Sequence, residues 1–168
     1  MRTFTLIAAL AAASPALADV EVTFRDGAPK DRFTITNIGG CPLGGSDVVI
    51  NLEGSPSGLI FDITGDGAGV EVFQPFELVT GADLVLTASD VADGDTTLVL
   101  SLAPMTTGDS VVFTIDLDDT VGTREITVSG SEIAGADVTL IPADLGPALT
   151  AVFDDTGRAV VTVPACVS

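Results

Sequence analysis

Apolar and polar residues alternate along short stretches of this chain. Val20, Val22 and Phe24 alternate with polar neighbours, and the same alternation runs over residues 33–37. A period of two places alternate side chains on the same face of a β-strand. The stretch 25–30 between them is rich in Asp, Gly and Pro and predicts a hairpin loop.

Similar runs, rich in Val, Ile, Thr and Phe, recur about every ten residues, a spacing typical of antiparallel sandwiches. We expect an all-β fold, an antiparallel β-sandwich of roughly ten to twelve short strands. The further predicted strands cover residues 48–52, 59–63, 70–79, 84–87, 97–102, 111–117, 125–129, 138–141, 149–153 and 160–163.

One of these strands carries the densest group of carboxylates in the chain. Its odd-numbered residues from 111 to 117 are apolar and are expected to face the core. Asp116 and Asp118 would then project together from the solvent face, about 7 Å apart. Asp119 follows at the strand end, and Glu125 lies across a turn. Ca²⁺ takes six to eight oxygen ligands, so we predict a calcium site at Asp116, Asp118, Asp119 and Glu125.

Two other acidic loops are weaker candidates for the same chemistry. The loop at residues 90–95 resembles half of a calcium loop but lacks the twelve-residue spacing and the closing Glu of an EF-hand. The alternative is that acidic loops only keep an apolar exported protein soluble. The candidate residues are Asp62, Asp66 and Glu71 in one loop, and Asp90, Asp93 and Asp95 in the other.

Pro75 interrupts the predicted strand at 70–79. Proline cannot donate to a strand ladder, so this strand is expected at a sheet edge or with a bulge. Apolar side chains on an exposed edge favour contact with another molecule. We predict a contact surface formed by Phe73, Gln74, Pro75 and Phe76.

The first 18 residues have the features of a secretory signal peptide. Arg2 precedes an apolar run over 6–13, and an Ala-Leu-Ala triplet ends at Ala18. The run is too short to span a bilayer, and no later segment is apolar enough for membrane insertion. We expect cleavage after residue 18 and a single domain over 19–168. The destination is the extracellular space or the cell surface, with the periplasm as the alternative.

Export gives meaning to the two cysteines, Cys41 and Cys166. In an oxidising compartment they are expected to form one disulfide, which stabilises the fold by roughly 4–5 kcal/mol in the chain-entropy model. A reactive or metal-binding thiol pair is the alternative.

Composition narrows the function classes. The 168 residues carry a formal charge of −18 and contain no His, Trp or Tyr. This charge argues against nucleic-acid partners, which recruit Lys and Arg. Imidazole chemistry is excluded, and a serine nucleophile would find only one lysine, Lys30, as a base. Two carboxylates could serve a glycosidase, but the aromatic platforms usual in sugar-cleaving clefts are absent. We therefore do not expect an enzyme.

The chain resembles the core protein of sponge aggregation factors, the ring-forming "Wreath" domain, and its secreted bacterial relatives. The resemblance covers nearly the whole mature chain and rests on residues 22–31, 33–37, 58–62, 69–76, 113–119 and 124–130. In that family the domain belongs to extracellular particles that hold cells together in a calcium-dependent way. The resemblance therefore implies an adhesive, self-associating module. The chain has no Asn-x-Ser/Thr sequon, so the glycan-bearing role of a sponge core has no acceptor here.

Together these features predict an exported, acidic, non-enzymatic β-sandwich for cell-surface adhesion or aggregation, assisted by calcium. Its expected partners are further copies of itself and cell-surface polysaccharide or protein. The alternative is a monomeric extracellular or periplasmic module that binds a ligand or glycan.

Overall fold

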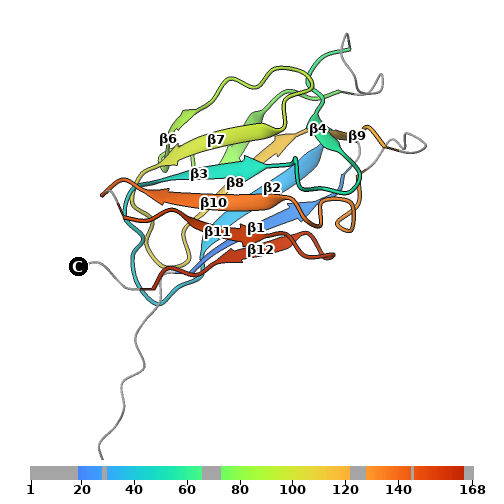
Figure 1. Cartoon of the computed structure of the whole chain (residues 1–168). Helices are drawn as coiled ribbons and strands as arrows, with labels where there is room; N and C mark the ends of the chain where they lie inside the picture. Colours follow the sequence, from blue (N-terminus) through green and yellow to red (C-terminus); the bar gives the residue numbers. More distant parts are fainter. Residues whose placement is uncertain (1–18, 28–29, 66–72, 122–127, 145, 165–168) are drawn as a thin grey trace, which may run out of the picture.

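The computed structural model describes residues 19–27, 30–65, 73–121, 128–144 and 146–164 (Figure 1). Within these ranges the chain forms twelve β-strands and no helix. The strands are β1 (Val20–Arg25), β2 (Asp31–Asn37), β3 (Ser46–Asn51), β4 (Leu59–Phe61), β5 (Glu77–Thr80), β6 (Val85–Ala88), β7 (Thr97–Leu102), β8 (Ser110–Ile115), β9 (Leu117–Asp119), β10 (Asp137–Pro142), β11 (Leu149–Val152) and β12 (Arg158–Val161).

Two five-stranded sheets pack face to face, which confirms the predicted all-β sandwich (Figure 1). The first sheet has the order β12-β1-β2-β8-β5, and the second has the order β11-β10-β3-β7-β6. Strands β4 and β9 form a small third sheet at one end. The strands pair antiparallel throughout these three sheets, as the spacing of the apolar runs predicts.

The core lies between the two large sheets and follows the predicted alternation. In β1, Val20, Val22 and Phe24 are buried while their neighbours are partly exposed. Phe33 stands opposite both Phe24 and Phe113, with ring centroids 5.2 Å apart in each pair. Aromatic pairs at this distance contribute beyond the area that they bury. The predicted core face of Val111, Phe113, Ile115 and Leu117 is buried and thus confirmed.

The other face of this segment does not behave as the sequence predicts. β8 ends at Ile115, and the chain then pairs with β4 as the separate strand β9. Asp116 and Asp118 are therefore buried, with only 7% and 2% of their surface exposed. Their predicted solvent exposure is wrong, because the chain changes partners at this point: β9 pairs with β4, and the backbone of Asp116 bonds to Asp62 and Gln74.

Pro75 lies just before an edge strand. Among the described strands, β5 is the last of the first sheet and begins at Glu77, after the proline. Its pairing with β8 shifts register between Leu78 and Thr80. The predicted edge position is confirmed, although the described strand starts later than the predicted range and its irregularity lies within β5 and not at Pro75.

Several predictions concern residues outside the described part of the chain. They are the signal peptide at 1–18, the cysteine Cys166, and the acidic residues Asp66, Glu71 and Glu125. Within the described ranges we find no helix with the length and hydropathy needed to cross a membrane.

Candidate functional site

Three segments distant in sequence meet at the end of the sandwich that carries the β4–β9 sheet (Figure 1). Asp62 directly follows β4, and its backbone N–H donates to the carbonyl of Asp116 over 3.0 Å. Asp31 opens β2 opposite Ile115, next to Asp116. We call the five buried aspartates of this region the acidic end; they are Asp31, Asp62, Asp116, Asp118 and Asp119.

The turn before β4 holds the small sheet in position. Gly58 has a φ of +64°, a conformation that glycine adopts at little cost. A Cβ at this position would lie 2.6 Å from the hydroxyl oxygen of Thr120. That hydroxyl instead donates to the carbonyl of Gly58 over 2.7 Å. The close approach fixes β4 beside β9 and so brings Asp62 to the acidic end.

Asp31 is a structural member of the acidic end that the sequence-based search for ligands missed. Its two carboxylate oxygens accept hydrogen bonds from the backbone N–H groups of Gly27 and Leu117, each over 3.1 Å. Burial raises the pKa of Asp31 to about 7, although both hydrogen bonds act in the opposite direction. A sequence signal was present: Asp31 lies in phase with the buried residues Phe33 and Ile35.

Asp116 lies in an unfavourable electrostatic environment at the acidic end. Burial raises the pKa of Asp116 to about 8, and the negative charges of Asp31, Asp62 and Asp118 add to the effect. Crowded carboxylates are held together by protonation or by a neighbouring positive charge. Protonation would therefore relieve the repulsion at this end of the molecule.

The loop 90–95 also reaches the acidic end. The Asp93 carboxylate accepts hydrogen bonds from the backbone N–H groups of Ile63 and Thr64, over 2.9 and 3.1 Å. The backbone of Phe61 bonds to both Gly94 and Asp95. Two of the three predicted acidic loops thus contact each other directly, and Asp62 links the first of them to Asp116.

The members of loop 90–95 differ in their surroundings. Asp95 closes its own turn by accepting the N–H of Ala92 over 2.7 Å. Asp90 is exposed.

The predicted contact segment, Phe73 to Phe76, bonds to two members of the acidic end. The backbone N–H of Gln74 donates to the carbonyl of Asp62 over 3.2 Å, and its carbonyl accepts from the N–H of Asp116 over 3.1 Å. Phe73 and Pro75 are exposed, whereas Phe76 packs against Phe113 with a centroid distance of 5.2 Å. Two predicted features, the acidic residues and the contact segment, are therefore one structural unit.

Exposed apolar side chains also occur beyond the residues that the sequence singled out. Val79 on β5 and Leu86 on β6 are 45% and 65% exposed. These strands are joined by residues 81–84 and form the edges of the two sheets on the same side of the sandwich. We call Phe73, Pro75, Val79 and Leu86 the apolar edge.

Only some of the predicted calcium ligands lie in the described part of the chain. Among these residues no group of three or more acidic side chains is arranged so that it could hold a metal ion. Of the four leading predicted ligands, Glu125 lies outside them, as do Asp66 and Glu71 of the weaker set. The calcium site stays a prediction.

Only one of the two cysteines of the predicted disulfide lies in the described part of the chain. Cys41 is buried, and the described part of the chain contains no free cysteine. Since Cys166 lies outside the described residues, the pairing stays a prediction.

Comparison of the chain with protein-family models, with curated proteins and with solved structures finds no match. The function is therefore argued from the residues and their arrangement.

Proposed function

We propose that this protein is an exported adhesive module that self-associates through its apolar edge, and that calcium at the acidic end promotes the association. The resemblance to aggregation factor core proteins supports this role. No group of the chain is assigned a catalytic part in it.

The backbone bridge made by Gln74 is the observation that carries the proposal. Its two hydrogen bonds connect the contact segment to Asp62 and to Asp116. A cation that drew the carboxylates of the acidic end together would also order the segment that presents Phe73 and Pro75. Ligand binding at one site and exposure of a contact surface are thereby linked through a single residue.

The apolar edge has features that favour association between copies. Edge strands offer unpaired backbone groups to another strand, and natural proteins usually protect them with charge. Here one ion pair, Lys30 with Glu77, lies at the start of β5, while Val79 and Leu86 are exposed farther along the two edges. The bulges of β5 and β6 limit the length of regular pairing, which favours a defined contact over open-ended aggregation.

Charge explains why such contacts would depend on calcium. A formal charge of −18 opposes the approach of two copies. Divalent cations both screen this repulsion and bind carboxylate oxygens. Extracellular calcium modules commonly bind with a Kd of about 10⁻⁴–10⁻³ M, so millimolar calcium is the relevant range.

Beads coated with the purified protein test this function. We expect the beads to cluster in millimolar calcium and to disperse when a chelator is added. The variant Leu86→Lys should reduce clustering, although it makes the protein less negative, because it removes an apolar contact. Asp155→Asn, a matched change of one charge at an exposed position, should cluster like the original protein. Clustering that is equal with and without calcium, or stronger in Leu86→Lys, would contradict the proposal.

A further inference from the structure

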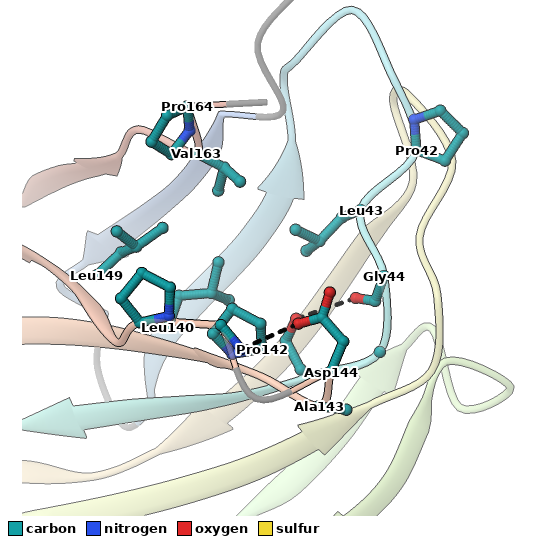
Figure 2. Close-up of a pocket in the computed structure, with 14 residues that line it drawn as sticks. Pro42, Leu43, Gly44, Leu140, Pro142, Ala143, Asp144, Leu149, Val163 and Pro164 are labelled. Atoms are coloured by element: carbon teal, nitrogen blue, oxygen red, sulfur yellow. Dashed lines mark hydrogen bonds between the residues drawn. The ribbon is translucent and has the colours of Figure 1, made fainter. Parts of the chain in front are cut away.

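An apolar pocket of about 610 Å³ lies at the end of the sandwich opposite the acidic end. Its walls come from the segment that leads into β3, from β10, β11 and their connection, and from the residues after β12, and Figure 2 shows them facing one another. Apolar side chains on these walls include Leu43, Leu140, Pro142, Leu149, Val163 and Pro164. Pockets of about 300–1,000 Å³ are typical of small-molecule sites.

The position of the pocket separates it from the proposed adhesive machinery. Strand β2 begins at Asp31 in the acidic end and finishes at Asn37, whose side chain contacts the loop that leads to Leu43. Seven residues of extended strand span roughly 20 Å. A ligand in the pocket would therefore touch neither the acidic end nor Gln74.

Buried hydrogen bonds hold the pocket wall in place before any ligand arrives. The Asn37 amide donates to the carbonyls of Cys41 and Met105, over 3.0 and 3.1 Å, and its side-chain oxygen accepts the N–H of Gly39 over 3.0 Å. Leu43 and Met105 form a two-way backbone bridge. A wall fixed in this way loses little entropy on binding.

The walls restrict the chemistry of a ligand. The described lining is aliphatic and contains four prolines, whose rings have few conformations, and no aromatic side chain. It thus provides no stacking surface for a sugar or a nucleobase, and it matches an alkyl chain. Four of the lining residues are Pro42, Pro142, Pro147 and Pro164.

One charged group lies at the rim. The side chain of Asp144 is exposed, and it accepts the backbone N–H of Gly146 over 3.2 Å (Figure 2). Asp144 is the charged residue among those that line the pocket. Together with the overall charge of −18, it favours a cationic head group and disfavours a carboxylate. We propose that the pocket binds the alkyl chain of an aliphatic ammonium compound, with Asp144 facing the ammonium group.

Eight-carbon probes that differ only in their head group test this proposal by calorimetric titration. Octylammonium should bind with saturation, octanol more weakly and octanoate weakest. Ethylammonium, which carries the charge without the chain, should not bind measurably. Asp144→Asn should lower the preference for octylammonium over octanol by about two- to fivefold, the range of an exposed ion pair, whereas Asp155→Asn at the far end should leave it unchanged.

A variant that fills the pocket provides a second test of the proposal. Gly44 lines the pocket, and a Cβ at this position would meet no atom within 4 Å, so Gly44→Leu is the variant chosen to add bulk to the lining. It should weaken octylammonium and octanol about tenfold. Backbone amide NMR shifts on titration of the unmodified protein should be confined to residues 42–46, 140–144, 146–149 and 163–164, a readout that needs no variant.

Four results would overturn the proposal: no saturable binding, octanoate binding as tightly as octylammonium, equal affinity for ethylammonium and octylammonium, or NMR shifts confined to the acidic end. Binding that appears only after residues 165–168 are removed would also overturn it, because the pocket would then belong to the chain's own C-terminus.

Discussion

The carboxylate of Asp31 accepts a hydrogen bond from the backbone N–H of Leu117 over 3.1 Å. This contact ties the first residue of β2 to the first residue of β9 and places a buried negative charge beside Asp116. The acidic end is therefore built into the fold and is not a set of solvated loops. Its protonation and its stability must be linked.

Stability should fall as the pH rises through the neutral range. The pKa is raised from 3.8 to about 7 for Asp31 and to about 8 for Asp116. Between pH 3.8 and these values the folded state binds more protons than the unfolded state, so raising the pH removes stability. The contribution of each group is complete below pH 3.8 and is lost as the pH passes about 7 and then about 8. Denaturant unfolding with chelator from about pH 4 to pH 9 measures this, and a free energy of unfolding that rises over the neutral range would contradict it.

Replacing Asp116 with asparagine should stabilise the protein at alkaline pH. Asn is neutral and of similar shape, so Asp116→Asn removes the repulsion from Asp31, Asp62 and Asp118. We expect the free energy of unfolding at about pH 9 to rise by about 1 kcal/mol or more, with a smaller gain near pH 5. The exposed control Asp155→Asn should change it by less than about 0.5 kcal/mol. Loss of stability in Asp116→Asn at both pH values would show that the charge is compensated in the fold.

Asn37 should be one of the most sensitive polar positions. It is fully buried and makes three hydrogen bonds through its side chain. Asn37→Ala leaves two carbonyls and one N–H without these partners and should cost about 2 kcal/mol or more. Asn51→Ala, at a partly exposed site bonded to Asp137, should cost about half as much or less. Thermal unfolding of both variants checks this, and equal melting temperatures would count against the proposed support of the pocket wall.

Two phenylalanines should separate stability from association. Phe33 lies within contact distance of three other rings, so Phe33→Ala should cost about 3–5 kcal/mol. Phe73 is 37% exposed, so Phe73→Ala should cost less than about 1 kcal/mol yet reduce clustering of coated beads in calcium. If Phe73→Ala clusters normally, Phe73 does not belong to the contact surface.

Alternation, together with the composition and spacing of the apolar runs, was enough to predict the sandwich. It located inner strands such as β1, β2, β3 and β7, because in these strands one face is buried and the other is more exposed. The alternation in β2 also indicates which polar side chains are buried. Asp31 and Asn37 occupy the same face of β2 as Phe33 and Ile35, so both could have been expected to be buried.

The acidic end could not be predicted in the same way. The period of a strand says which side chains share a face, but not whether another segment will cover that face. Asp116 and Asp118 are covered because β8 stops at Ile115 and β4 pairs with the chain beyond it, a contact between residues far apart in sequence. The bridge through Gln74 is made by its backbone N–H and carbonyl, so the type of side chain at this position does not reveal it.

Sedimentation equilibrium of the purified mature protein across a calcium titration tests whether calcium brings these molecules together. We predict a monomer in chelator, a rise in mass in millimolar calcium, and a loss of that rise in Leu86→Lys and in Asp116→Asn. A mass that stays monomeric at every calcium concentration, with an unchanged melting temperature, would contradict both the calcium site and the adhesive function.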